Sequence, residues 1–304
     1  MIIAFIHPHI AFLPEIDAYQ NFFSTFSIKT IVAGPKEIKN INADVEWHFM
    51  GTDFSKKDKT VKIHEYTSAS VSPLRKGKNI AKKILNAQPD YRLFLNKYVE
   101  GQFNFKDKIP NGYRDMGIDI SFLKPDNNVK KEFDFIYAGS INKERKIEKL
   151  FNLFTRENMK DHSLLILSNN YENLKSKLKS YQNIFFAGPV KHEEVKNYIE
   201  KSRFALNFIL DEEPFNQQTS TKFLEYAALK IPIITTCYVW VKKFQQQYGG
   251  NYFCLDNDLS NLSWKSISEF NYSFPELNEW TWEKQIRKSG ILEFLQSKFP
   301  ELSF

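Results

Sequence analysis

The chain has 304 residues, of which 42% are hydrophobic and 26% charged, values typical of a globular protein with about two domains. No stretch approaches the roughly 18 apolar residues of a membrane-spanning helix. The apolar start Met1–Ile6 is too short for a secretory signal and predicts a first strand instead. The net charge of +6 favours an anionic partner, which could be a nucleotide, a nucleic acid or an acidic membrane surface.

Five short apolar runs in the first half of the chain alternate with helical patterns, which predicts an α/β fold with parallel sheets. His64 directly follows the fourth run, at a carboxyl end where such sheets bind ligands. It is therefore a candidate active-site residue, as are His7 and His9 after the first run; the alternative is a hydrogen-bonded structural histidine. The predicted strands are Ile2–Ile6, Ile28–Val32, Val45–Phe49, Val61–Ile63 and Arg92–Leu95.

The segment Leu74–Leu85 carries five basic residues and no acidic one. Ile80, Ala81, Ile84 and Leu85 form an apolar stripe along it. This pattern is typical of a surface helix that rests on anionic lipid, and the alternative is an ordinary solvated helix of the first domain. The basic residues match no nucleic-acid-binding motif, so no nucleic-acid partner is expected.

A domain boundary is predicted near residue 125. Ile109–Gly112 has the composition of a turn, and Phe122–Glu132 contains a proline, two asparagines and several charges, as linkers do. The predicted parts are an N-terminal domain over 1–125, a C-terminal domain over 126–280, and a helix over 281–304 that returns to the first domain.

The second half repeats the α/β pattern. Gly139 allows close backbone approach after the first of its strands, and Arg145 and Lys146 could neutralise phosphate at the following helix start. Helices are predicted over Glu144–Phe154 and His192–Lys201. The predicted strands are Phe133–Tyr137, Leu164–Leu167, Ile184–Phe186, Phe204–Phe208 and Ile231–Thr235.

The segment Glu213–Ile234 predicts a polar loop, a helix from Thr221 to Leu229 and a buried strand. Lys222 and the first amides of the helix could hold phosphate, and Glu225, one turn later, could accept hydrogen bonds from a ribose. The alternative is an ordinary exposed pair of helix residues.

No metal site is predicted. Asp256-Asn-Asp258 is better explained as a turn cap than as a metal ligand, because no other ligands cluster with it. Cys237 and Cys254 have no metal-type spacing and are expected to be reduced thiols in a cytoplasmic protein. His48, His162 and His192 show no pattern of a site and are expected to be structural or at the surface.

Several motifs, in chain order, resemble those of the family 4 GT-B glycosyltransferases. They correspond to the family's interdomain linker, its donor loop, a strand near the base, the lysine–glutamate block, and the start of the final helix. The matching segments are Ile109–Asp115 with Phe122–Pro125, Phe135–Arg145, Ile184–Pro189, Ser220–Ile234 and Trp280–Glu283.

The resemblance implies two Rossmann-like domains with a cleft between them. The second would bind a nucleotide-sugar and the first an acceptor, with retention of anomeric configuration and without a metal or other cofactor. In this family pattern the diphosphate, the ribose and the base are held by separate groups. The implied catalytic residues are Arg145, Lys222 and His64, and the implied donor-binding residues are Gly139, Ser140, Gly188, Pro189, Asn216, Gln217, Ser220, Thr221 and Glu225.

The chain departs from the family pattern at several positions. Ser140 stands where an arginine is common, and Arg145 where a lysine is usual. Gln217 replaces a second glutamate that contacts the sugar, a role that Glu213 or Asn216 could take over. A glycine pair after the first strand is also absent. The identity of the sugar therefore stays open.

The predicted protein is a cytoplasmic glycosyltransferase that moves a sugar from a nucleotide diphosphate to a hydroxyl of a glycan or lipid-linked glycan, as in surface polysaccharide synthesis. It would work at the inner face of the membrane if the segment 74–85 touches lipid. The alternatives are a nucleotide-sugar epimerase of similar build, a non-catalytic sugar-nucleotide binder and a membrane-associated scaffold.

Overall fold

The computed structural model describes residues 1–8, 13–49, 53–54, 59–70, 75–141, 146–156, 158–169 and 171–304. It divides into two compact units. Unit 1 comprises Met1–Gly117 with Glu279–Phe304, and unit 2 comprises Ile118–Asn278. Every helix in the described ranges is too short or too polar to traverse a lipid bilayer.

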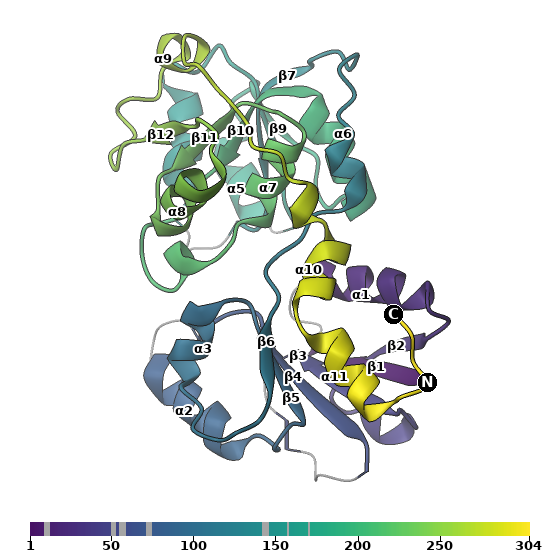
Figure 1. Cartoon of the computed structure of the whole chain (residues 1–304). Coiled ribbons are helices and arrows are strands. Elements are labelled where there is room, and N and C mark those ends of the chain that lie inside the picture. The colour runs from purple at the N-terminus through teal and green to yellow at the C-terminus, as the bar shows by residue number, and fades with distance from the viewer. Residues whose placement is uncertain are drawn as a thin grey trace. The chain divides into compact units, whose positions relative to one another are not determined.

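Unit 1 contains a six-stranded parallel sheet in the order β2-β1-β3-β4-β5-β6 (Figure 1). Its strands are β1 (Ile2–Ile6), β2 (Lys29–Ala33), β3 (Val45–Phe49), β4 (Val61–Tyr66), β5 (Tyr91–Phe94) and β6 (Asn111–Tyr113). Its helices are α1 (Pro14–Ser24), η1 (Ile38–Asn40), α2 (Arg75–Leu85), α3 (Lys97–Phe103), α10 (Trp282–Lys288) and α11 (Ile291–Lys298), and η6 (Asn278–Trp280) begins at its boundary.

The two faces of this sheet are covered by different helices. Ile16 and Tyr19 recur at helical spacing in α1 and pack on Trp47 of β3, together with Ile291 of α11. The C-terminal segment is therefore part of the core of unit 1. On the opposite face the ring of Tyr66 lies 4.5 Å from that of Phe103 in α3.

Unit 2 contains a second six-stranded parallel sheet, in the order β12-β11-β10-β7-β8-β9. Its strands are β7 (Phe133–Ala138), β8 (Leu164–Leu167), β9 (Ile184–Phe186), β10 (Ser202–Asn207), β11 (Ile233–Thr236) and β12 (Phe253–Leu255). Its helices are η2 (Ile120–Leu123), α4 (Glu148–Phe151), η4 (Asn152–Thr155), α5 (Glu172–Leu178), α6 (His192–Glu200), η5 (Phe215–Gln217), α7 (Thr221–Ala228), α8 (Val239–Tyr248) and α9 (Trp264–Ser268). The predicted α/β class and parallel sheets are confirmed.

Several predicted elements were wrong in detail. The turn at Ile109–Gly112 gives way to β6, which pairs with β5 at the edge of the sheet. Strand β12, of which three residues pair with β11, was not predicted. The predicted single final helix is instead two helices, α10 and α11, because Gly290 between them adopts a left-handed φ of +75°.

Cys237 and Cys254 form a disulfide, with their Cα atoms 5.4 Å apart. The expectation of reduced thiols was therefore wrong. The reason lies in the sheet: Thr235 of β11 pairs with Cys254 of β12, so the residue two positions after Thr235 comes beside Cys254. Because β12 was not recognised in the sequence, neither was this proximity.

Candidate active site

The strand order of unit 2 creates a switch point between β7 and β10. Starting from β7, the chain adds β8 and β9 on one side, then crosses to add β10, β11 and β12 on the other. Connections therefore leave β7 and β10 in opposite directions. In open parallel sheets, ligands bind in the crevice at the carboxyl ends of such strands.

The loop after β10 leads into α7, whose start is fixed by a chain of buried hydrogen bonds. Ser220 caps the helix by accepting a hydrogen bond from the Phe223 amide at 3.3 Å. Its hydroxyl donates to Asn207 Oδ1 at 2.8 Å, and Asn207 Nδ2 donates to Thr235 Oγ1 at 2.9 Å. The helix start is thus tied to the ends of β10 and β11, which orients its amides toward the switch point.

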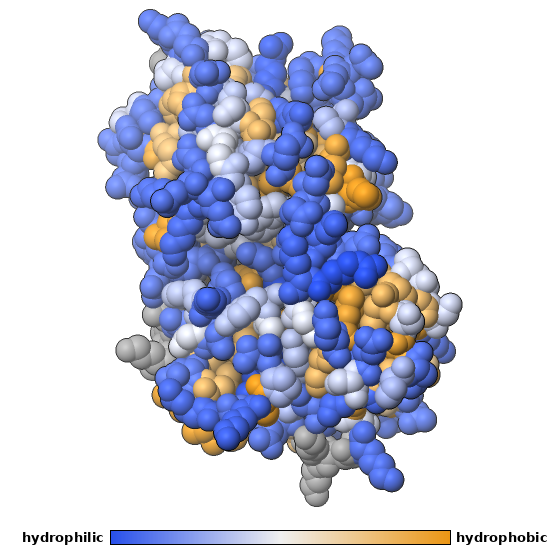
Figure 2. All heavy atoms as spheres, viewed as in Figure 1, coloured by the Kyte–Doolittle hydropathy of each residue, from blue (hydrophilic) through white to orange (hydrophobic). Residues whose placement is uncertain are grey.

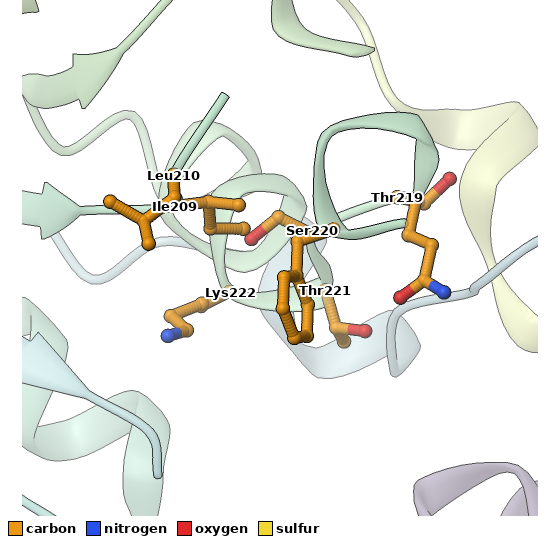
Figure 3. Close-up of a pocket in the computed structure, with 8 residues that line it drawn as sticks. Ile209, Leu210, Thr219, Ser220, Thr221 and Lys222 are labelled. Carbon is orange, nitrogen blue, oxygen red and sulfur yellow. The ribbon is translucent and has the colours of Figure 1, made fainter. Parts of the chain in front are cut away.

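A cavity of about 190 Å³ lies against this helix start. Figure 3 shows Ile209 and Leu210, from the loop after β10, beside the first turn of α7 with its Lys222 side chain. Polar groups of the helix start and apolar side chains of the loop share the lining, as in many small-molecule sites. The lining residues are Ile209, Leu210, Phe215, Gln218, Thr219, Ser220, Thr221 and Lys222.

Lys222 reaches from α7 to the end of β7. Its Nζ lies 3.4 Å from Tyr137 Oη and 4.5 Å from the centre of the Tyr137 ring. Gly139 makes room for it, because a Cβ at Gly139 would lie 2.5 Å from that nitrogen. The Tyr137 hydroxyl in turn donates to the Ser140 carbonyl at 2.9 Å. The ammonium group and the β7 loop are therefore brought together across the switch point.

Glu225 lies one turn further along α7 and is 5% exposed. Its Oε1 is 3.0 Å from His192 Nε2, at the start of α6. No pattern in the sequence links these two residues, since 33 positions separate them and His192 was expected to be structural or at the surface. The pair was missed because only the packing of α6 beside α7 creates it.

The remaining predicted donor-site residues lie on the loops around the sheet. Asn216 Nδ2 donates to Asp211 at 2.9 Å, whereas its buried Oδ1 has no hydrogen-bond partner in the described part of the chain. Gln217 ends η5 beside Gln218 of the cavity lining. Gly188 has φ +72° and lies against Tyr171, with Pro189 exposed beside it. Arg145 lies outside the described residues.

His64 was expected beyond the end of its strand, and this placement was wrong. Strand β4 continues to Tyr66, so His64 is an interior strand residue with no exposed surface. Its Nε2 lies 3.0 Å from Asp53 Oδ2. Burial lowers the pKa of the imidazole. A polar cluster surrounds it on the same face of the sheet, and its members are Glu46, His48, Asp53, Lys62 and His64.

Unit 1 contains a second buried network on its other face. Glu65 accepts hydrogen bonds from Trp47 Nε1 at 2.8 Å and from Arg114 Nε at 2.9 Å. Glu15, at the start of α1, lies 3.6 Å from Arg114, and burial raises its pKa to about 7. Tyr19 also donates to Glu65, at 3.1 Å. These charges are paired with one another inside the unit.

The Asp256–Asp258 segment forms a turn, in which Asp258 Oδ1 accepts the Ser260 amide at 3.0 Å. This hydrogen bond lowers the pKa of Asp258. The predicted turn cap is confirmed. Among the described residues, no three His, Cys, Asp or Glu side chains gather as metal ligands would.

No known family model matches the chain, and no curated protein matches it at the sequence level. Solved structures do match. A glycosyltransferase of avilamycin A biosynthesis, AviGT4, superposes with a TM-score of 0.59 at 12% identity, over 99% of this chain and 97% of its own. A glycosyltransferase from Rickettsia africae gives the same TM-score of 0.59 at 12% identity, over 99% of both chains.

An epimerase has a comparable fold. The UDP-GlcNAc 2-epimerase of Methanocaldococcus jannaschii, solved with UDP-GlcNAc and UDP, superposes with a TM-score of 0.55 at 14% identity, over 97% of this chain and 100% of its own. Identities this low establish architecture and not activity. The chain therefore has the two-domain, Rossmann-like GT-B fold shared by these glycosyltransferases and epimerases.

Proposed function

We propose that this protein is a retaining glycosyltransferase of the family 4 type. It would bind a nucleotide-sugar at the β7–β10 switch point of unit 2 and transfer the sugar to a hydroxyl of a glycan or lipid-linked glycan. The observation that carries the proposal is the meeting of Lys222 with Gly139 beside the capped start of α7. One cation, a close backbone approach and helix amides are what a diphosphate requires.

Each remaining part of the donor is assigned to a neighbouring group. Ser220 and Thr221 bind the diphosphate from the helix start. Gly139 and Ser140 bind it from the loop after β7, and Arg145 supplies a second cation. Glu225 accepts hydrogen bonds from the ribose, in an orientation fixed by His192. The donor's base lies along Gly188 and Pro189, as in the family pattern.

Asn216 and Gln217 are assigned to the sugar. The unpartnered Asn216 Oδ1 is a buried acceptor, and a sugar hydroxyl could satisfy it. This would compensate for the missing second glutamate at position 217.

The chemistry follows from where charge develops. The bond between the anomeric carbon and the diphosphate oxygen breaks, and the departing oxygen takes the electron pair. The acceptor oxygen forms the new bond to the anomeric carbon and passes its proton to the departing diphosphate oxygen. Lys222 and the α7 amides, already oriented, would stabilise the leaving diphosphate, which is the largest contribution expected from such a site. No metal is assigned to this step.

His64 is assigned no part in the transfer. Its fully buried ring offers no surface to a substrate, so its predicted catalytic role has no support beyond the family pattern. Substitution of His64 by Gln is instead expected to lower stability.

Nucleotide binding tests the proposal directly. Thermal unfolding is measured with UDP, GDP, dTDP and ADP; saturation at 100 times the dissociation constant adds about 2.7 kcal/mol of stability. Glu225→Gln should weaken binding of the best nucleotide about tenfold or more, through a lost charged hydrogen bond. Glu293→Gln, on α11 of unit 1, is the matched control. If none of the four nucleotides stabilises the protein, the donor site is wrongly assigned.

The epimerase of the same fold is the alternative enzyme. An epimerase would convert a nucleotide-sugar without any acceptor, whereas a transferase releases nucleoside diphosphate in proportion to acceptor. Product release measured with and without glycan acceptors separates the two activities.

We also propose a cytoplasmic location, where the donor would be available. Because this compartment keeps most thiols reduced, the Cys237–Cys254 disulfide of the structure provides a test of the location. Alkylation of freshly lysed cells followed by mass spectrometry measures the fraction of this disulfide. A fully oxidised pair would contradict the location and leave the donor site unaffected.

A further inference from the structure

Helix α2 of unit 1 turns its apolar stripe outward. Ile80, Ile84 and Leu85 are 56%, 72% and 58% exposed, whereas Asn79 is buried. A surface helix ordinarily buries its apolar stripe and exposes its polar one. Figure 2 shows hydrophobic side chains among hydrophilic ones at the surface in the region of α2.

Among the α2 residues whose exposure is described, only Asn79 is buried, and its hydrogen-bond partners are polar groups of neighbouring segments. Asn79 accepts a hydrogen bond from the Ser70 amide at 3.4 Å and donates to the Gln102 carbonyl at 3.3 Å. Lys83 Nζ donates to the Asn104 carbonyl at 2.8 Å. These contacts hold the helix with its isoleucines toward solvent, so the exposed stripe is built into the fold.

The same polar surroundings extend into the sheet. Lys62 and His64 alternate with Ile63 along β4 and lie on the face that carries Tyr66, against α3. Asp53, bonded to His64, also receives the Ala87 amide just beyond α2, at 2.7 Å. The buried polar cluster therefore lies on the side of the sheet to which the end of α2 is anchored.

A further exposed apolar side chain, Phe54, follows a residue that is hydrogen-bonded to the end of α2. Phe54 is 69% exposed, and its neighbour Asp53 is held to Asn86, at the end of α2, by a hydrogen bond of 2.9 Å. Four large apolar side chains are thus exposed on α2 or next to its end, namely Phe54, Ile80, Ile84 and Leu85.

A groove of about 450 Å³ runs beside this stripe, between α2 and the segment Ser68–Ser70. Lys78 and Lys82 line it together with Leu85. Burial and the nearby Lys78 charge lower the pKa of Lys82. An anion bound in the groove would favour the charged form of Lys82. Cationic and apolar groups therefore meet at one surface.

The charge of the chain is concentrated in the same region. Residues 75–108 contain nine basic and three acidic side chains, a net charge of +6, which equals that of all 304 residues. The rest of the chain is neutral overall. An apolar stripe within a strongly basic region is complementary to an anionic lipid surface, where lysines bind headgroups and aliphatic side chains enter the acyl boundary.

We propose that α2 docks unit 1 on an anionic lipid bilayer. Ile80, Ile84 and Leu85 insert at the headgroup boundary together with Phe54, and Lys78 and Lys82 bind lipid phosphates. This proposal uses no residue of the donor site, so it stands or fails independently of the proposed function.

Vesicle co-sedimentation of the full chain tests it. The wild-type protein should bind vesicles containing about one-third phosphatidylglycerol much more strongly than pure phosphatidylcholine, and lose most binding at high salt. Ile80→Ser with Ile84→Ser should weaken partitioning about tenfold or more. Lys78→Gln with Lys82→Gln should weaken it by about fivefold per lysine.

Matched controls lie in unit 2. Ile120→Ser with Phe185→Ser removes two exposed apolar side chains, and Lys242→Gln with Lys243→Gln removes two exposed charges. Both control pairs should bind vesicles as the wild type does. Circular dichroism and the melting temperature verify that every variant is folded.

Three results would overturn the proposal. One is equal binding of the wild type to both kinds of vesicle. Another is wild-type binding by both α2 variants. The third is a wild-type dimer in sedimentation velocity that Ile80→Ser with Ile84→Ser converts to a monomer, which would assign the stripe to a second copy of the chain.

Discussion

The residues that line the candidate site of unit 2 lie beyond the ends of its strands, whereas many charged side chains of unit 1 lie within its strands. Lys222 and Ser220 stand at a helix start next to a cavity. Glu65 and His64, by contrast, occupy interior positions of β4 with almost no exposed surface. Two sheets of the same type thus differ in where their polar groups lie: in unit 2 Lys222 and Ser220 line a cavity, whereas in unit 1 the charges are paired internally.

The difference teaches that residue type alone does not mark a site. A histidine and a glutamate in adjacent strand positions resemble an active site in the sequence, yet each is hydrogen-bonded to groups in its own unit. What distinguishes Lys222 is position, because it crosses from one side of a switch point to the other.

Arg114→Ala should have the largest effect on stability. The guanidinium is 1% exposed and pairs with Glu65 and Glu15, so its removal leaves buried carboxylates without a cation. We expect a loss of about 3–5 kcal/mol in the free energy of unfolding, measured with urea. Arg203→Ala, which breaks a half-exposed pair with Asp134, should cost less than about 1 kcal/mol. Similar values for both would contradict a structural network in unit 1.

Lys222→Ala should have the largest effect on activity and little effect on stability. Loss of a preoriented cation at the leaving group is expected to raise the barrier by about 3 kcal/mol, a fall in kcat of over a hundredfold. Lys242→Ala, on α8, is the matched control and should turn over normally. If Lys222→Ala instead lowers the melting temperature substantially, the role of Lys222 is structural, like that of the buried charges of unit 1.

Glu15→Gln should change how the free energy of unfolding depends on pH. The folded protein keeps Glu15 protonated up to about pH 7, and this bound proton contributes to the free energy of unfolding. The contribution is present in full below the unfolded pKa of 4.5. The wild type then loses stability as pH rises through 7, by up to about 3 kcal/mol relative to the glutamine variant. Urea unfolding of both proteins at several pH values between 4 and 8 measures this difference. Parallel curves would mean that burial does not raise the pKa of Glu15 as described.

Gly139→Ala should have a smaller effect on stability, about 1–2 kcal/mol, since its φ of +148° strains an alanine. Gly249→Ala, at φ +81° with nothing within 4 Å, carries comparable strain without a neighbour. Only the Gly139 variant pushes Lys222 aside, so only it should weaken nucleotide binding. Equal nucleotide affinity in the two variants would separate Gly139 from the donor site.

Much of the fold was predictable because its determinants are local. Ile2–Ile6, Leu164–Leu167 and Ile184–Phe186 have the predicted bounds, since a short buried strand of a parallel sheet is a continuous apolar run. Val45–Phe49 also has its predicted bounds, and there the apolar residues alternate with Glu46 and His48 at the period of a strand. Helix α7 begins at the predicted Thr221, because Ser220 is a good cap residue whatever surrounds it. The positions of Lys222 and Glu225 on one helix follow from the same local periodicity.

Only the tertiary structure decided which distant groups meet. The strand order brought Gly139 to Lys222 and the packing of α6 brought His192 to Glu225. The pairing of β11 with β12 joined the two cysteines, and the polar face of the sheet left the isoleucines of α2 exposed. Local sequence determines whether a segment is a helix or a strand, and therefore which of its side chains share a face. Which of its faces is buried depends on chain far away, because burial is a property of the assembled layers.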